Sequence, residues 1–313
     1  MTEHQRHILN SPDGHDIHVQ TWAPSGTVIA VIQLLHGLGE HADRYARFAT
    51  AATARGIAVC THDHRGHGQH TKHLGHFADK GGWQALVADA RIVNEYISAC
   101  FVGQPLVLLG HSMGSYVAQN YAMHYGRELD GLILSASTWS SRPALYAAYM
   151  VAKIEYWRRG AHVSSPLLDK LGFGSFNKAF EPARTGLDWL SRDATEVDKY
   201  VADPMCGGPC SCGLWLDLIG GLLAITSDNA ISQIRADLPI LISGGASDPV
   251  GGDRGMTHLA MHYAQTGHQR ITVKIYADGR HEMLNETNRD DVTDDWLNWI
   301  VAKVVSLKKK PQP

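Results

Sequence analysis

Short apolar runs alternate with longer amphipathic segments along much of this sequence. Residues 27–35, TVIAVIQLL, are apolar almost throughout, as is typical of a strand buried on both faces of a parallel sheet. A turn at 11–14 that contains Asp13 and Gly14 predicts a β-hairpin over 7–22. The pattern predicts an α/β fold, with a mostly parallel central sheet and helices on both faces. Further strands are expected at 56–60, 106–109, 132–134, 238–242 and 271–276, and helices at 43–55, 82–100, 113–125, 255–265 and 291–305.

The alternation stops between residues 138 and 232. This block contains helix-like segments such as 144–157 and 214–225 and no clear strand. Because the alternation resumes afterwards, we expect a helical cap, or lid, inserted after the sixth core strand rather than a second tandem domain. The core would then comprise residues 1–137 and 233–313, and the cap residues 138–232.

A short glycine-flanked motif, GHSMG at residues 110–114, lies between a predicted strand and a predicted helix. A turn this tight leaves no room for side chains two positions before and after its central residue, which explains Gly110 and Gly114. It lifts Ser112 above the sheet at a helix N-terminus, whose N–H groups favour a developing negative charge. This context predicts a nucleophile elbow with Ser112 as the nucleophile.

A serine hydroxyl needs a base to remove its proton, and in this arrangement the acid and the histidine follow the serine in the chain. Two late strands are followed by suitable residues, Asp248 and His281. Both would lie at the same sheet edge as Ser112, with Asp248 orienting the imidazole of His281. Two other acids compete for this role: Asp278 is expected to cap the loop before His281, and Asp253 to cap the following helix.

Stabilising the oxyanion of an acyl-transfer reaction requires two backbone N–H donors. One is expected from Met113, directly after the serine, and the other from Leu38 in the loop after strand 27–35. Loss of one such donor typically costs about 2.7–4 kcal/mol of transition-state stabilisation.

Two clusters of residue types that can bind metals occur in the sequence. The spacing of His62, His64 and His67 does not match a strong zinc pattern, so hydrogen bonding within loops is expected instead. The three cysteines of the 206–212 segment lack a fourth ligand in sequence, and no metal is predicted there either. The two isolated cysteines are expected to be buried or half-buried thiols. These five residues are Cys206, Cys210 and Cys212 in the cluster, and Cys60 and Cys100 outside it.

Charge and hydropathy exclude several classes of protein. The formal net charge is −3, so the broad basic surface of a nucleic-acid-binding protein is not expected. The one basic run, at 308–310, is interpreted as a solvated tail. The first residues lack an apolar signal-peptide core, and no run of 18 apolar residues occurs. A cytoplasmic protein with reduced thiols is therefore expected.

Four motifs taken together resemble one enzyme family. HGLGEH at 36–41, DHRGHG at 63–68, GHSMG at 110–114 and DGRHEMLNE at 278–286 resemble the monoacylglycerol lipase and lysophospholipase branch of the α/β-hydrolases, a group similar to the serine aminopeptidases S33. The resemblance implies hydrolysis of carboxylic esters of lipid-like alcohols without a cofactor. It also implies a small-molecule acyl-ester substrate and a cap that covers the acyl site and can touch a membrane surface peripherally.

Other functions remain open at this point. The same residues could serve a short- or medium-chain carboxylesterase, or a peptidase or amidase. A perhydrolase or haloperoxidase would use the same three groups. A non-catalytic relative would lack at least one of them, and all three are present here. The apolar segments of the cap could line an acyl tunnel or simply pack on the core, because the two kinds of helix look alike in sequence.

Overall fold

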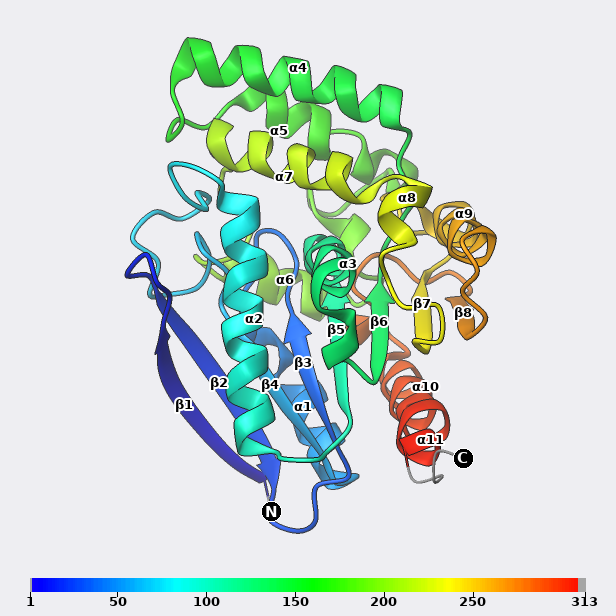
Figure 1. The fold of residues 1–313 in the computed structure, drawn as a ribbon. Coiled ribbons are helices and arrows are strands. Elements are labelled where there is room, and N and C mark those ends of the chain that lie inside the picture. Colours follow the sequence, from blue (N-terminus) through cyan, green and yellow to red (C-terminus); the bar gives the residue numbers. More distant parts are fainter. Residues whose placement is uncertain (1, 309–313) are drawn as a thin grey trace.

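The centre of the molecule is a twisted sheet that confirms the predicted α/β class (Figure 1). The structure, a computed structural model, describes residues 2–308. Its sheet has eight strands in the order β1-β2-β4-β3-β5-β6-β7-β8. The strands are β1 (Thr2–Asn10), β2 (Asp16–Pro24), β3 (Ala30–Leu35), β4 (Ile57–His62), β5 (Leu106–His111), β6 (Gly131–Ser135), β7 (Ile240–Gly245) and β8 (Ile271–Tyr276).

The predicted hairpin forms the antiparallel edge of this sheet. β1 pairs with β2, and β2 pairs antiparallel with β4, whereas the strands from β4 to β8 pair in parallel. In this register Leu35 lies beside Gly110, and His111 beside Ser135. The carboxyl ends of the central strands therefore meet at one edge, as parallel strands require.

Helices cover both faces of the sheet, each with its own buried apolar cluster. One face carries α2 (Gly82–Cys100), α3 (Met113–Tyr125) and α9 (Gly252–Gln265), and the other carries α1 (Ala46–Ala54) and α10 (Arg289–Ile300). Side chains from α2 and α3 in the first cluster and from α1 and α10 in the second exclude water from the strands between them. The parallel strands are consequently apolar on both sides, which explains the unbroken apolar runs of the sequence.

Several predicted boundaries were wrong by a few residues. The strand predicted at 27–35 begins only at Ala30, and the one predicted at 238–242 is β7, two to three residues later. The helix expected at 43–55 divides into a 3₁₀ turn, Ala42–Tyr45, and α1. The helix expected at 291–305 is α10, continued by a π-helical turn (Val301–Val305) and α11 (Ser306–Lys308). Apolarity alone does not mark where backbone pairing starts and stops.

Between β6 and β7 the chain forms helices that lie beyond the carboxyl ends of the strands (Figure 1). The helix α7 (Cys212–Ile225) packs against α2, where Gly221 lies so close to Trp83 that a Cβ atom would stand 2.1 Å from the indole. Glycine at this position therefore lets the two helices approach. The helices are α4 (Arg142–Arg159), α5 (Pro166–Phe173), α6 (Ala194–Ala202), α7 (Cys212–Ile225) and α8 (Asp228–Ile231).

The basic run at 308–310 is only partly described. Lys308 forms an ion pair with Asp130 at 2.9 Å, so it is not a freely solvated residue, and residues 309–310 lie outside the described part of the chain. Within residues 2–308, no helix has both the length and the apolar character needed to cross a bilayer.

Candidate active site

The predicted elbow joins β5 to α3 with Ser112 at its tip. Ser112 has φ 50° and ψ −119°, a conformation that side-chain-bearing residues rarely adopt. A Cβ atom on Gly110 would lie 2.3 Å from the carbonyl oxygen of Gly114, and one on Gly114 would lie 2.2 Å from that of Leu35. The glycines are thus required by close backbone packing, which fixes Ser112 at the first turn of α3.

Asp248 and His281 meet at the same sheet edge, in the loops after β7 and β8. The Nδ1 atom of His281 lies 3.0 Å from both carboxylate oxygens of Asp248, and Oδ1 of Asp248 also accepts from the N–H of Val250 at 2.9 Å. Burial alone would lower the pKa of His281, but the charge and the hydrogen bond of Asp248 outweigh it and raise that pKa above its ordinary value. The contact with Asp248 therefore favours the protonated form of the His281 imidazole.

Ser112 and His281 line the same cavity. Within the described residues no hydrogen bond joins the two side chains, which is common before a substrate is bound. The structure therefore places all three predicted residues at one site. Of the two hydrogen bonds expected among them, the one between Asp248 and His281 is formed. Their catalytic roles stay predictions.

The two competing acids lie away from this contact. Asp253 is inside the first turn of α9, whose N-cap position is occupied by Gly251, so the predicted capping role of Asp253 was wrong. Its carboxylate accepts from the N–H of Arg254 at 2.7 Å and is exposed. Asp278 is an exposed turn residue with φ 58°, and among the described residues its side chain forms no hydrogen bond that would cap the loop.

The predicted oxyanion donors both face the cavity. Leu38 and Met113 line it, and Met113 is the first residue of α3, where N–H groups have no partner within the helix. On either side of Leu38 the N–H groups are used: Gly37 donates to Oε1 of Glu40 at 2.6 Å, and Gly39 donates to Nε2 of His67 at 3.2 Å. In the described chain the N–H of Leu38 has no such acceptor, so it is available to a ligand.

A buried charged network beneath this loop was missed by the sequence analysis. Glu40 binds Gly37, accepts from the hydroxyl of Tyr45 at 2.7 Å and contacts Arg44 at 2.7 Å. Arg44 also forms a two-pronged ion pair with Glu282, at 2.6 and 2.7 Å. Although burial opposes ionisation, Arg44 holds the pKa of Glu40 below its ordinary value. Because Glu282 follows His281 directly, the network connects the loop of residues 36–41, called the oxyanion loop below, to the loop of residues 277–282, called the histidine loop.

The ring of His36 contacts the rings of His64 and His67 in tilted and edge-on geometry. The predicted hydrogen bonding within loops is found for His67 and was wrong for the side chains of His62 and His64. His36 Nε2 accepts from the N–H of His64 at 2.9 Å, which leaves Nδ1 to donate to the carbonyl of Gly37 at 2.7 Å. His67 is held in the same way between Gly39 and Arg65. The buried imidazoles of His62 and His64 have no hydrogen-bond partner among the described residues, and the HxHxxH residues do not converge on a metal position.

The cysteines also form no shared site. All five are free thiols, and the cluster residues face different surroundings: Cys206 is half-buried beside His41 and Asp203, whereas Cys210 and Cys212 are buried. Cys60 is buried as expected. Cys100 is exposed, contrary to the prediction, because it is the last residue of α2 and lies beyond the packed face of that helix.

The cavity above Ser112 has a volume of about 540 Å³. Its walls come from the oxyanion loop, the elbow, α5, α7 and the 207–210 segment, and it falls in the range typical of small-molecule sites. The 207–210 segment is tied to the oxyanion loop, since Gly207 donates to the carbonyl of Gly39 at 2.9 Å. Most large side chains in the lining are apolar or aromatic: Tyr116, Phe173, Phe176, Trp189, Trp215, Leu218 and Leu222.

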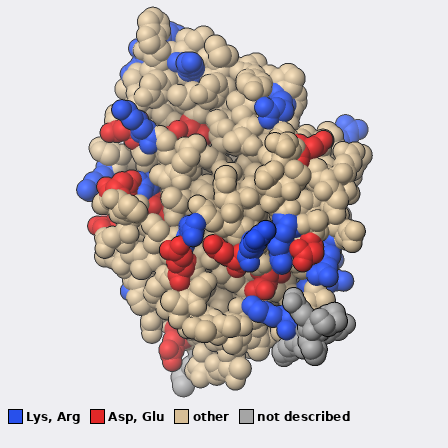
Figure 2. All heavy atoms as spheres, in the orientation of Figure 1, with Lys and Arg blue, Asp and Glu red and all other residues tan. Residues whose placement is uncertain are grey.

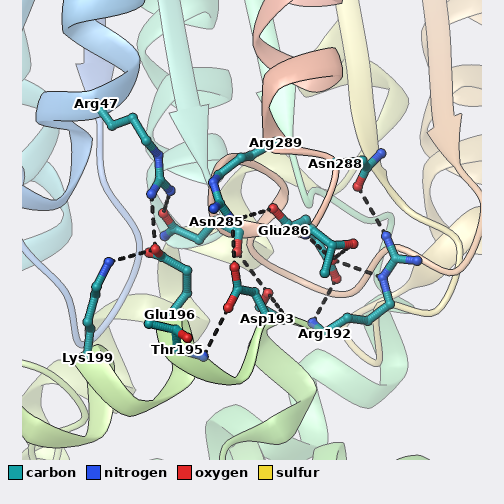
Figure 3. Close-up of polar contacts among 12 residues, drawn as sticks. Arg47, Arg192, Asp193, Thr195, Glu196, Lys199, Asn285, Glu286, Asn288 and Arg289 are labelled. Carbon is teal, nitrogen blue, oxygen red and sulfur yellow. Dashed lines mark hydrogen bonds and ion pairs between the residues drawn. The ribbon is translucent and has the colours of Figure 1, made fainter.

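Polar contacts connect the α6 region with the loop that follows His281 (Figure 3). The fully buried carboxylate of Glu286 accepts from Nε of Arg192 at 2.9 Å and from the N–H of Arg280 at 3.0 Å. Arg289 pairs with Asp193 at 2.7 Å. Through Arg280, the neighbour of His281, this network fixes the histidine loop against the residues between β6 and β7. Glu196 adds ion pairs to Arg47 and Lys199 at 3.0 and 2.8 Å.

The chain resembles known proteins over most of its length. Residues 26–288 match the model of the family described as serine aminopeptidase, S33. The chain is 29% identical to a monoglyceride lipase of Homo sapiens, and the match covers 90% of this chain and 84% of that protein. It is also 29% identical to a monoacylglycerol lipase of Mycolicibacterium smegmatis, where the match covers 95% of this chain and 96% of that protein. Among solved structures, a thermostable carboxyl esterase from Bacillus coagulans in complex with glycerol is similar, with a TM-score of 0.88, 25% identity and coverage of 96% and 99%. The chain belongs to the serine aminopeptidase S33 family, in the monoglyceride-lipase branch of the α/β-hydrolases.

Proposed function

We propose that the protein is a serine hydrolase that cleaves carboxylic esters of lipid-like alcohols, such as monoacylglycerols or lysophospholipids. The observation that carries this proposal is the largely apolar cavity of about 540 Å³ that reaches Ser112, His281 and the N–H groups of Leu38 and Met113. An acyl ester needs one polar reaction centre and an apolar space for its chain, and the cavity supplies both.

In the proposed reaction Ser112 Oγ attacks the ester carbonyl while His281 Nε2 takes the hydroxyl proton. Asp248, bonded to Nδ1, holds the tautomer that leaves Nε2 free and stabilises the imidazolium. The oxyanion is bound by the N–H groups of Leu38 and Met113. His281 then protonates the departing alcohol, and water hydrolyses the acyl-enzyme by the reverse sequence of proton transfers.

We further propose that residues 138–232 act as a cap over a core of residues 1–137 and 233–313. Aromatic side chains from this segment, including Phe173, Trp189 and Trp215, form part of the wall of the cavity that Ser112 also lines. An acyl chain between that wall and the elbow would be shielded from water. The similarity to a monoglyceride lipase and a monoacylglycerol lipase supports the same substrate class.

The outer surface of the cap supports peripheral contact with an anionic lipid surface. Tyr146, Met150, Ile154 and Trp157 recur along one face of α4 at helical spacing, and all are exposed, Trp157 by 84%. The one acid of α4, Glu155, is buried, and Arg158 and Arg159 lie in the last turn of the helix. Figure 2 shows Lys and Arg among uncharged residues at the end of the molecule that α4 occupies in Figure 1. Phe173 is both exposed and part of the cavity lining, so the cavity reaches the surface of this segment.

A substrate series tests the proposal. Monoacylglycerols and lysophospholipids of graded chain length are compared with p-nitrophenyl acetate and with aminoacyl nitroanilides. We expect kcat/KM to rise with acyl length to about ten carbons or more, because each buried CH₂ contributes about 0.8 kcal/mol. Highest activity on acetate would instead identify a short-chain esterase. Faster turnover of the anilides by orders of magnitude would identify an amidase or peptidase and reject the lipase proposal.

A further inference from the structure

A second group of ionisable side chains lies outside the catalytic cavity, between two loops. His76 and Asp79 belong to the loop between β4 and α2, and His162 to the loop between α4 and α5, and the two loops approach each other (Figure 1). Oδ1 of Asp79 lies 3.3 Å from Nε2 of His76 and 3.0 Å from Nε2 of His162. The three ligand atoms all lie within 4.8 Å of one another.

We propose that His76, Asp79 and His162 form a binding site for a divalent transition metal ion such as Zn²⁺. Two imidazoles and one carboxylate are a donor set that zinc prefers. Ligands about 2.0–2.1 Å from a tetrahedral zinc ion are separated from each other by roughly 3.4 Å. The two separations from the Asp79 oxygen, 3.3 and 3.0 Å, are close to this value. The rings of His76 and His162 have centroids 4.2 Å apart, so the exposed ring of His162 would turn outward to admit the ion.

One ligand is already fixed in orientation. His76 is buried, and its Nδ1 lies 2.9 Å from the hydroxyl of Ser211, which also accepts from the N–H of Leu214 at 3.0 Å. The ring packs on Gly213, where a Cβ atom would stand 3.0 Å from Cε1. If Nδ1 donates its proton to Ser211, the lone pair of Nε2 is directed to the metal, the usual outer contact of a ligating histidine.

The other two ligands are accessible. Asp79 and His162 have side-chain exposures of 79% and 55%. His76 and Asp79 also line an open cleft of about 270 Å³, which offers an entry path and space for a water ligand in the fourth position. Arg65, a cation in the same lining, is already neutralised by ion pairs to Asp13 and Asp89.

The position of the site gives it a structural consequence. Ser211 donates its backbone N–H to the carbonyl of Gly75 at 2.8 Å, and the adjoining Pro209 and Cys210 line the catalytic cavity. A metal ion shared by His76, Asp79 and His162 would therefore fasten the edge of the α4–α5 region to the β4–α2 loop beside one wall of that cavity. Binding to the folded state alone raises the melting temperature as metal concentration increases.

The test measures Zn²⁺ binding by titration calorimetry and the melting temperature with and without Zn²⁺, on the full chain. We expect one Zn²⁺ per chain and a higher melting temperature in its presence. Asp79→Asn and His162→Ala should each weaken Zn²⁺ binding at least tenfold and abolish the thermal shift, with the metal-free melting temperature unchanged because both residues are exposed.

His124→Ala, which replaces an exposed histidine on α3, is the matched control and should bind Zn²⁺ as the parent chain does. Parent-like Zn²⁺ binding by both site variants, or no binding by the parent below 100-fold excess of metal, overturns the site.

Discussion

At the scale of single residues, the site depends on backbone positions more than on side-chain identity. Ser112 is held with φ 50° by the two glycines of the elbow. The N–H groups of Gly37 and Gly39 are hydrogen-bonded, whereas that of Leu38 has no acceptor in the described chain. The histidine is oriented by Asp248 on one nitrogen. Each of these features orients one group before a substrate arrives, so little reorganisation is needed during the reaction.

Replacing the proposed nucleophile gives the first prediction. Ser112→Ala should lower ester hydrolysis by about 10³-fold or more and abolish labelling by a fluorophosphonate, because no other activated hydroxyl replaces it. Ser140→Ala is the matched control, since its hydroxyl lines the same cavity. Full labelling of the Ser112→Ala protein would show that another residue is the nucleophile.

The raised pKa of His281 gives a prediction for the pH profile. The base must be neutral, so activity is present above the pKa of His281 and is lost as pH falls through it. Because Asp248 raises that pKa, the acid limb of kcat/KM should lie above pH 6.5, the ordinary value for histidine. In Asp248→Asn the limb should move to lower pH and the rate should fall about 10⁴-fold. An unchanging rate between pH 5 and 8 contradicts His281 as the base.

At the scale of elements, close contacts between strands and helices determine where glycine is required. Gly114 of α3 lies against the carbonyl of Leu35 on β3, whereas Gly126 after α3 has open space around it and a helical φ of −61°. On the outside of the molecule, the face of α4 that carries Met150, Ile154 and Trp157 is exposed, and no described residue buries it. One helix is thus restricted by packing and the other is left available to a partner.

The two glycines near α3 form a matched pair. Gly114→Ala should destabilise the fold by about 1–3 kcal/mol or more, because its Cβ would stand 2.2 Å from a backbone oxygen. Gly126→Ala should be neutral or stabilise by up to about 1 kcal/mol, because it restricts the unfolded chain without a clash. Urea melts measure both. Equal effects of the two substitutions would mean that the strand–helix packing is looser than described.

The exposed face of α4 predicts a lipid-dependent behaviour. Trp157→Ala should weaken sedimentation with vesicles of anionic phospholipid by about tenfold, since a large apolar side chain is withdrawn from the bilayer surface. Val102→Ser removes a comparably exposed apolar residue (80%) from the loop after α2 and should not alter vesicle binding. Loss of vesicle binding in the Val102 variant alone would place the contact on another face.

At the scale of the whole molecule, buried histidines couple folding to pH. Burial lowers the pKa of His62 to about 3 and those of His67 and His111 to about 4. These imidazoles are neutral in the folded state, whereas in the unfolded chain they take up protons below about pH 6.5. The unfolded state therefore binds more protons in this range, and stability is lost as pH falls.

We expect the free energy of unfolding to decrease between pH 7 and pH 5 by about 2 kcal/mol for each such histidine. His62→Leu should reduce this decrease by about 2 kcal/mol, because the buried His62 imidazole has no hydrogen-bond partner among the described residues and its replacement is apolar. Urea melts at the two pH values measure the difference. An unreduced pH dependence in the variant contradicts the assignment.

Local rules of the chain were enough for much of the fold and for the residues of the site. The apolar runs predicted the strands because parallel strands are buried on both faces, and the GHSMG motif predicted the elbow because only glycine fits there. Strand and helix ends were less accurate, as at Ala30 and Ala46. The Glu40–Arg44–Glu282 network was missed. Arg44 and Glu282 are 238 residues apart in the chain, so no local spacing pattern links them.

The sequence by itself determined the α/β class, the elbow around Ser112 and the identity of Asp248 and His281 as residues brought to one sheet edge. These follow from local periodicity and from the fixed direction of parallel strands. Only the tertiary structure decided which N–H groups remain unpaired, which walls enclose the cavity, and that His162 meets His76 and Asp79. These are relations between segments far apart in the chain, and they are set by packing, which no local pattern records.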